Sequence, residues 1–303
     1  MHRALSLARK GEGNVSPNPM VGAVIVCGDR IIGEGFHRCY GEPHAEVNAI
    51  NSVKEEDRPL LKEATMYVTL EPCSHFGKTP PCADLVVKTG IPRVVIGSKD
   101  PNPKVAGKGK KILKEAGVEV VSGILEKECK DLNRRFMKAH TDARPWIILK
   151  WAQSADGYMA GKDNGGNLCS TSFSSPLSKV WMHRERGSVD AIMIGTNTEK
   201  IDRPRLDVRS WTAHSPIKII ADSHKDLKEY LEQIRREGIT SLMVEGGPTL
   251  LESFLSRNLF DEIRVETSPI FLEKGIKAPD IPNDIKLMDS FKCRDNEIRI
   301  FRS

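Results

Sequence analysis

Hydrophobic positions in the first 140 residues alternate between a period of two and a period of about 3.6, which predicts strands interleaved with helices. The predicted helices cover residues 1–10, 44–53, 83–89, 105–116 and 125–140, and the predicted strands cover 21–27, 30–36, 65–70, 93–97 and 118–121. Gly28 and Asp29 separate the first two strands and predict a tight hairpin turn. This order is typical of an α/β layered domain.

A second alternation begins after the polar segment 141–145, so we expect two domains, residues 1–143 and 144–303. Here the predicted strands are 146–152, 190–194, 217–221, 241–245 and 262–267, and the predicted helices are 177–186, 227–237 and 249–257. A length of 303 residues fits two domains of ordinary size. The sequence therefore predicts two α/β domains in tandem.

Composition and charge exclude several classes of protein. The hydrophobic residues make up 39 % of the chain, which excludes a disordered or low-complexity protein. No apolar run reaches the length of a membrane helix, and residues 4–8 form too short an apolar core for a signal peptide, so we expect a cytoplasmic protein. The net charge of +5 is spread along the chain, unlike the basic stripe of a nucleic-acid-binding protein, and it suits a small phosphorylated substrate.

One histidine and two cysteines in the first half have the pattern of a catalytic zinc site. Three protein ligands, His44, Cys73 and Cys82, leave one tetrahedral position of Zn²⁺ open for water. Cys82 also opens a predicted helix, whose positive N-terminus stabilises a thiolate. Glu46 lies two positions after His44, where a carboxylate can take a proton from water and pass it to a departing amine.

The pattern His-x-Glu followed by Pro-Cys and a second cysteine is the signature of zinc-dependent base deaminases. In this chain the two cysteines are nine positions apart, whereas the generic signature has Cys-x-x-Cys. The alternative is that these residues only pack in a core, because cysteine is often buried. The adjacent prolines and the His-x-Glu favour zinc, and we interpret the remaining cysteines as structural: Cys27, Cys39, Cys129, Cys169 and Cys293.

Segments 16–23, 44–46 and 71–82 of the first domain resemble the bifunctional riboflavin-biosynthesis deaminase–reductases. The stretch Ser-His-Phe-Gly-Lys-Thr-Pro-Pro between the two cysteines distinguishes this family from cytidine, guanine and transfer-RNA adenosine deaminases. The second domain resembles the family in residues 152–157, 190–198, 202–209 and 244–249. The resemblance implies a cytidine-deaminase-like three-layer α/β/α domain followed by a dihydrofolate-reductase-like α/β domain.

The resemblance also implies the substrate, the cofactors and their contacts. The substrate is a diaminohydroxy-pyrimidinone with a phosphoribosylamino group, and the cofactors are Zn²⁺ and NADPH. The implied deaminase contacts are Asn18, His37, Lys78, Asp100 and Asn102. The implied reductase substrate contacts are Ser170, Arg186, Leu206, Arg209 and Glu245, and the implied NADPH contacts are Ala152, Ser172, Thr198, Asp202, Ser223, Gly246 and Gly247. A glycine turn such as Gly246-Gly247, between a strand and a helix, can hold a phosphate on backbone N–H groups.

Two features depart from the family. Ser172 stands where the family usually has a tryptophan, so an aromatic stacking contact is absent. The strand at 217–221 also runs almost directly into the next helix, where the family has several tens of residues more. Either the reductase domain is shortened in its cofactor-binding sheet, or residues are missing from the sequence between Ser223 and Leu227.

The sequence thus predicts a riboflavin-biosynthesis enzyme that deaminates the pyrimidine and then reduces its ribosyl group to ribityl with NADPH. We expect further copies of the same chain as partners, and neither nucleic acid nor membrane. One alternative is a deaminase whose second domain does not reduce, which the short cofactor region motivates. A second alternative is an RNA-binding zinc module, against which the modest charge and the 17 aromatic residues argue.

Overall fold

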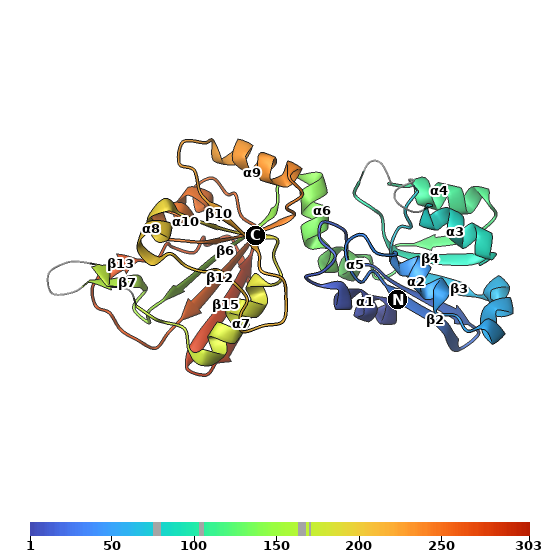
Figure 1. The fold of residues 1–303 in the computed structure, drawn as a ribbon, viewed down its shortest axis with the longest axis horizontal. Helices are drawn as coiled ribbons and strands as arrows, with labels where there is room; N and C mark the ends of the chain where they lie inside the picture. The colour runs from blue at the N-terminus through green and yellow to red at the C-terminus, as the bar shows by residue number, and fades with distance from the viewer. Residues whose placement is uncertain (75–79, 103–105, 163–167, 170) are drawn as a thin grey trace. The chain divides into compact units, whose positions relative to one another are not determined.

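The computed structural model describes residues 1–74, 80–102, 106–162, 168–169 and 171–303. The chain divides into two compact units, Met1–Ala143 and Arg144–Ser303, each built on its own sheet (Figure 1). Among the described residues, no helix is long and apolar enough to cross a membrane.

The sheet of the first unit has the strand order β2-β1-β3-β4-β5. Strand β1 pairs antiparallel with β2 and β3, whereas β3, β4 and β5 are parallel. The carboxyl ends of β3 and β4 therefore meet at one edge, where ligands bind in open α/β sheets. The strands are β1 (Gly22–Cys27), β2 (Arg30–Phe36), β3 (Thr65–Leu70), β4 (Arg93–Ser98) and β5 (Glu119–Ser122).

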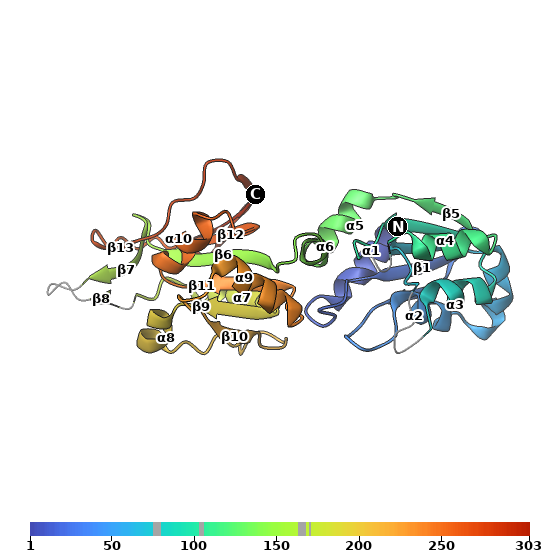
Figure 2. The same ribbon diagram turned by 90° about the horizontal axis from the view of Figure 1, so that it is seen from above.

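Helices cover both faces of this sheet, which confirms the predicted three-layer α/β/α domain (Figure 2). On one face Ala49, Val86 and Leu113 of α2, α3 and α4 join the strand residues in a buried core, and on the other Leu7 of α1 packs near Val24. The helices are α1 (His2–Ala8), α2 (Ala45–Asn51), α3 (Cys82–Thr89), α4 (Lys108–Glu115), α5 (Glu126–Leu132) and α6 (Arg134–Thr141), with 3-10 turns at Arg9–Gly11 and Glu55–Glu63.

The prediction of one helix over residues 125–140 is wrong, because α5 ends at Leu132 and α6 begins at Arg134. Asn133 between them is buried, with φ −102° and ψ 23°. Its side-chain amide donates to the Met20 carbonyl and its side-chain oxygen accepts from the Met20 N–H, both at 2.8 Å. This pairing with a segment distant in sequence explains the interruption, which helical periodicity does not reveal.

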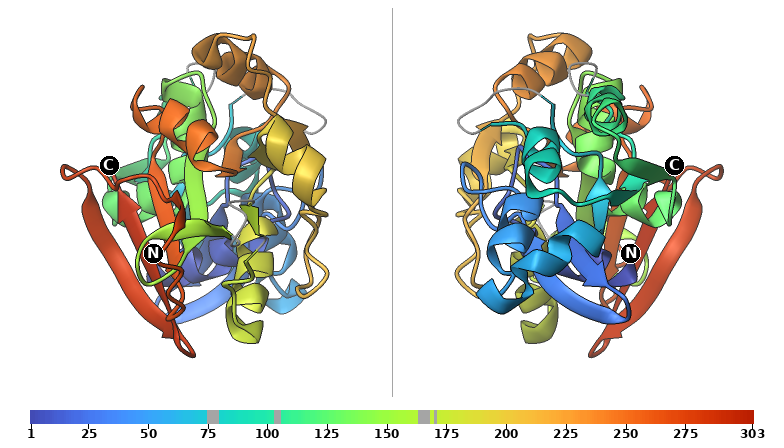
Figure 3. Two further views of the ribbon diagram at one scale, coloured as in Figure 1. Left: turned by 90° about the vertical axis from the view of Figure 1, so that its left-hand side faces the viewer. Right: turned by 90° about the vertical axis from the view of Figure 1, so that its right-hand side faces the viewer.

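The main sheet of the second unit has the order β10-β9-β11-β6-β12-β15-β14, in which the first five strands are parallel. The last two strands form an antiparallel hairpin, which is coloured red in Figure 3. The carboxyl ends of β6, β9, β10 and β11 therefore meet at one edge. The strands are β6 (Trp146–Gln153), β9 (Ala191–Ile194), β10 (Ile217–Ile220), β11 (Ser241–Glu245), β12 (Glu262–Thr267), β14 (Lys286–Cys293) and β15 (Asn296–Arg302).

Helices α9 (Leu227–Arg236) and α10 (Pro248–Leu255) pack on one face of this sheet, where Phe254 is fully buried (Figure 1). Helix α7 (Pro176–Arg186) packs on the other face, where the ring of Trp181 contacts the ring of Phe291 in β14. A small sheet joins β13 (Gly275–Lys277), β7 (Tyr158–Lys162) and β8 (Leu168–Cys169), and α8 (Thr196–Asp202) follows β9. The predicted α/β class is therefore confirmed for both units.

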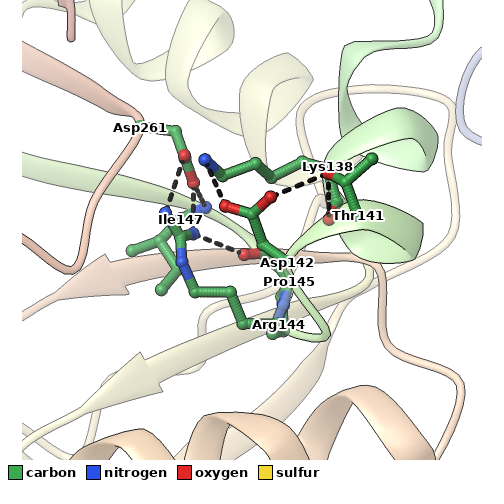
Figure 4. Close-up of polar contacts among 7 residues, drawn as sticks. All are labelled: Lys138, Thr141, Asp142, Arg144, Pro145, Ile147 and Asp261. Atoms are coloured by element: carbon green, nitrogen blue, oxygen red, sulfur yellow. Dashed lines mark hydrogen bonds and ion pairs between the residues drawn. The ribbon is translucent and has the colours of Figure 1, made fainter.

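The start of the second unit is held by one buried carboxylate (Figure 4). Arg144 donates from Nη1 and Nη2 to the two oxygens of Asp261, at 2.6 and 2.9 Å. The N–H of Ile147 donates to the same carboxylate at 2.8 Å. These bonds connect the first residues of β6 to the loop that precedes β12.

The connection from β10 to α9 is as short as the sequence predicts. It consists of residues 221–226, in which the Ala221 N–H donates to Ile194 O and Asp226 caps α9 by accepting from the N–H groups of Lys228 and Glu229. Strand β10 is the edge of the sheet, and Ile217 and Ile220 are exposed there.

Candidate functional site

Three side chains of the first unit lie at the distances that a zinc ion requires. His44 Nδ1 lies 3.6 Å from Cys73 Sγ and 3.4 Å from Cys82 Sγ, and all three atoms lie within 4.8 Å of one another. Zn–S bonds of about 2.3 Å and Zn–N bonds of about 2.0 Å place such ligand atoms roughly 3.5 Å apart around a tetrahedral ion. The donor set and its spacing therefore fit zinc.

Each of the three metal-binding residues lies at or near the end of a helix or strand. His44 is the N-cap of α2 with φ −70° and ψ 168°, so the predicted helix 44–53 begins one residue late. Cys82 is the first residue of α3, and its N–H donates to Cys73 Sγ at 3.3 Å. Cys73 follows β3 by three residues. An N–H bond to the sulfur stabilises a thiolate, as second-shell partners do in metal sites.

The electrostatics of the two cysteines favour a cation between them. A hydrogen bond from Cys82, together with one from His44, lowers the pKa of the Cys73 thiol to about 4. The hydrogen bond with Cys73 and burial raise the pKa of the Cys82 thiol. Two thiolates this close repel each other unless a positive ion neutralises them, so the pair is suited to a divalent metal.

Glu46 lies in the first turn of α2, 3 % exposed, and beside this cluster. Burial and the negative charge of Cys73 raise the pKa of Glu46 to about 7. A hydrogen bond also joins Glu46 to Cys82. A carboxyl group with a pKa near neutrality can both accept and release a proton during one reaction.

Two of the implied substrate contacts, Asn18 and His37, are bonded to each other. His37 Nδ1 lies 3.2 Å from the Pro43 carbonyl oxygen, and because a carbonyl oxygen can only accept, Nδ1 is the donor. The other ring nitrogen, Nε2, is then unprotonated and accepts from the Asn18 amide at 3.1 Å. Burial lowers the pKa of His37 and favours this neutral form. The two ring centroids of His37 and His44 lie 5.4 Å apart, so this pair borders the metal ligands.

Asp100 and Asn102 lie just after β4, on the same sheet edge as Cys73. Asp100 is buried, and its Oδ1 accepts from the Asn102 N–H at 2.7 Å. Of the five implied deaminase contacts, His37 with its partner Asn18 borders a metal ligand, and Asp100 and Asn102 share the sheet edge with Cys73. Lys78 lies outside the described residues.

In the second unit, Arg186 and Glu245 form one buried pair instead of two separate contacts. Arg186 Nε and Nη2 donate to the two oxygens of Glu245, at 2.9 and 2.8 Å. Burial raises the pKa of Glu245, but the charges of Lys150 and Arg186 outweigh it and hold the pKa below its usual value. Arg186 is the last residue of α7 and Glu245 is the last residue of β11, so the pair lies at the carboxyl-end edge of the sheet.

The other implied reductase contacts differ in their surroundings. Leu206 is buried in the core with φ +55°. Arg209 is exposed and paired with Asp207. Ser170 lies outside the described residues.

Several of the implied NADPH contacts lie at the carboxyl ends of the parallel strands. Gly246 and Gly247 follow β11, and among the described residues no atom lies within 4 Å of a Cβ placed on Gly247, or of one placed on Gly195 after β9. These glycines precede α10 and α8, whose N-terminal N–H groups can receive phosphate oxygens. Ala152 and Ser223 belong to this edge, Thr198 and Asp202 lie on α8, and the exposed Ser172 offers no aromatic ring. The residues therefore fit the phosphates of a dinucleotide.

Sequence reasoning missed two polar groups at these sites. Glu71, close to the metal-binding Cys73, is a buried carboxylate. Its position directly after the apolar strand β3 could have indicated from the sequence that it is buried. Lys150 is buried in β6, where its Nζ contacts Met182 Sδ at 3.3 Å and its charge acts on Glu245. The sequence could have indicated this role, because Lys150 interrupts an apolar strand and a buried lysine is almost always paired.

Comparisons with known proteins agree with this geometry. Residues 1–98 match the zinc-binding region of cytidine and deoxycytidylate deaminases, and residues 145–299 match the RibD C-terminal domain. Together with the two folds, these matches define a deaminase domain joined to a reductase domain. The chain belongs to the RibD family of bifunctional riboflavin-biosynthesis deaminase/reductases.

The relatives resemble the chain over nearly its full length. It is 38 % identical to riboflavin biosynthesis protein RibD of Aquifex aeolicus, covering 98 % of this chain and 94 % of that protein, and 34 % identical to RibD of Escherichia coli, covering 99 % and 95 %. The crystal structure of a diaminohydroxyphosphoribosylaminopyrimidine deaminase/5-amino-6-(5-phosphoribosylamino)uracil reductase from Thermotoga maritima superposes with a TM-score of 0.88 at 33 % identity, covering 100 % of this chain and 97 % of that one.

These alignments also bear on the length of the chain. The match to the Aquifex protein spans 342 positions, whereas this chain has 303 residues, so at least 39 positions of the alignment have no counterpart here. The location of the gap between Ser223 and Leu227 stays a prediction.

Proposed function

We propose that residues 1–143 deaminate a 2,5-diamino-6-(5-phosphoribosylamino)pyrimidin-4(3H)-one and that residues 144–303 reduce the ribosyl group of the product to ribityl. The observation that carries the first half is the placement of His44, Cys73 and Cys82 within 4.8 Å of one another, beside the buried Glu46. The names of the relatives support the substrate, since the Thermotoga protein is named for this deaminase and this reductase.

His44, Cys73 and Cys82 would hold the zinc, and when bound it supplies a Lewis acid that lowers the pKa of a water at the open ligand position. Glu46 accepts the proton of the attacking water and passes it to the leaving amine, for which a pKa of about 7 is suited. Asn18 and His37 bind the pyrimidine edge, and Asp100 and Asn102 hold the ribose hydroxyls. Lys78 completes the set as a point charge for the phosphate or the polar edge.

In the second unit, NADPH supplies the hydride and the protein supplies its orientation. Gly246 and Gly247 receive its phosphates at the start of α10, with further contacts from Ala152, Ser172, Thr198, Asp202 and Ser223. Arg186 and Glu245 hold the substrate, together with Ser170, Arg209 and Leu206. Glu245 is ionised and held by Arg186, so it presents acceptors to hydroxyl groups of the sugar.

The test of the deaminase is ammonia release from the diaminopyrimidinone by the zinc-loaded chain. We expect turnover that disappears when a chelator removes zinc and returns when zinc is added back. Absence of ammonia release by a chain that binds one zinc would overturn the proposal.

A second candidate is a deaminase without reductase activity, which the exposed Ser172 and the shortened chain favour. The deaminated substrate, added with NADPH, separates the two candidates. Loss of nicotinamide absorbance supports the reductase, and unchanged absorbance supports the deaminase alone.

A further inference from the structure

Glu71 is a buried carboxylate that the proposed reaction does not use. It follows β3, lies two residues before the zinc-ligand Cys73, and is 5 % exposed. Its Oε2 accepts from the Gly107 N–H at 3.0 Å and its Oε1 accepts from the Lys110 N–H at 3.1 Å. Both N–H groups belong to the start of α4, where backbone donors have no partner within the helix. The carboxylate therefore joins the metal-ligand segment to α4.

The backbone beside Glu71 also touches α4. A Cβ placed on Gly109, in the first turn of α4, would lie 2.0 Å from the carbonyl oxygen of Pro72. Only glycine permits this approach. The segment that leads to Cys73 is thus held against α4 by a close backbone contact as well as by two charge-assisted hydrogen bonds.

The bonds of Glu71 bracket the turn that carries Asp100 and Asn102. The Glu71 N–H donates to Ser98 O at 3.0 Å, which is before the turn, and the carboxylate holds Gly107, which is after it. Within the turn, the Ala106 N–H donates to Asn102 O at 2.8 Å and the Asn102 N–H donates to Asp100 Oδ1 at 2.7 Å. A series of bonds therefore runs from the metal-ligand segment to the two residues proposed to hold the ribose.

We propose that Glu71 is a positioning residue that fixes the Asp100–Asn102 turn relative to Cys73, and so sets where the ribose of the substrate lies relative to the metal. It neither binds zinc nor moves a proton. A glutamine in its place keeps one carbonyl acceptor but turns an NH₂ donor toward the second N–H, which leaves that N–H unpaired in a buried site. The inference rests on the proposed deaminase function.

The test compares Glu71→Gln with Asp57→Asn, which changes a buried acid to an amide in the same unit. Asp57 is paired with Arg30 and has no part in the site. Zinc content and ammonia-release kinetics are measured with the full substrate and with the triaminopyrimidinone that lacks the ribose phosphate. Loss of an ionised hydrogen-bond partner changes binding by about ten- to a hundredfold. We expect Glu71→Gln to raise KM for the full substrate by that factor, with kcat and zinc content near those of the unchanged chain.

The base analogue provides the decisive comparison. Because it has no ribose, we expect Glu71→Gln and the unchanged chain to process it with equal kcat/KM, and Asp57→Asn to change neither substrate. Equal losses on both substrates, an unchanged KM, or loss of zinc would overturn the inference. Glu71→Asp, which keeps the charge and shortens its reach, gives the same comparison if the glutamine variant does not fold. An unchanged chain that releases no ammonia would instead overturn the proposed function itself.

Discussion

At the scale of single residues, the first unit places a buried carboxyl group, Glu46, beside a triad of metal-binding side chains. Glu46 is buried against the cysteines, and burial together with the charge of Cys73 raises its pKa to about 7. The thiol and imidazole donors of His44, Cys73 and Cys82 lie at zinc spacing, and all three belong to the first unit. Metal binding and proton transfer are thus proposed for different side chains and can be tested by separate substitutions.

Glu46→Gln tests proton transfer. Because the amide cannot carry a proton, we expect deaminase kcat to fall by about 10²- to 10⁴-fold while one zinc per chain remains bound. Metal analysis and ammonia release on the same sample check both statements. A Glu46→Gln variant with full activity would contradict the role of Glu46.

Cys82→Ser tests metal binding, with Cys129→Ser as the matched control. Both cysteines are buried, but Cys129 lies on α5, away from the triad. Since a serine hydroxyl is a poor zinc ligand, we expect Cys82→Ser to lose zinc and activity, and Cys129→Ser to keep both. Equal zinc content in the two variants would exclude Cys82 as a ligand.

At the scale of elements, a buried charge network fixes β12 between β15 and α7. Glu262 is 1 % exposed and accepts from Arg264 Nε at 2.6 Å and from Arg302 Nε at 2.9 Å, and Arg264 also pairs with Glu185. Burial raises the pKa of Glu262, but the charge of Arg264 and the hydrogen bond from Arg302 outweigh it and hold the pKa below 4.5. A carboxylate of this kind contributes stability above its unfolded-state pKa and loses it as the pH falls.

We therefore expect Glu262→Gln to lower the free energy of unfolding at neutral pH by about 3 kcal/mol, since it leaves buried guanidinium groups unpaired. The loss should diminish as the pH falls below the ordinary pKa of a glutamate, because the glutamate of the unchanged chain then also takes up a proton. Urea denaturation at several pH values checks this. Glu232→Gln, in the exposed pair with Arg236, should change the free energy by less than about 1 kcal/mol at any pH. A pH-independent difference for Glu262→Gln would contradict the sign of its pKa shift.

Elements with clear runs of apolar residues were predictable from the sequence, including the mostly exposed edge strand β10, whereas others were not. Strands β3, β11 and β12 have the predicted bounds, because most of their side chains are buried. The pattern predicted neither β14, whose side chains are mostly exposed, nor α8, which has no buried residue. The metal ligands were predictable from residue type and spacing, whereas the partners of Glu71 and Asn133 depend on contacts between distant segments.

At the scale of the whole molecule, each unit has its own core, so the two should unfold separately. Phe254→Ala, at a fully buried position of α10, should destabilise the second unit by about 3–5 kcal/mol. Removing zinc should lower the unfolding temperature of the first unit only. Calorimetry of the full chain with and without a chelator checks both, and a single transition that responds to both changes would contradict separate units.

The central claim is that one chain carries out both reactions, and a combined assay tests it most directly. The zinc-loaded chain is incubated with the phosphoribosylamino-diaminopyrimidinone and NADPH while ammonia and nicotinamide absorbance are recorded together. We predict that one NADPH is consumed for each ammonia released, and that Glu46→Gln stops both until deaminated substrate is added, which restores NADPH consumption alone. Ammonia release without any loss of NADPH, even with deaminated substrate present, would contradict the claim.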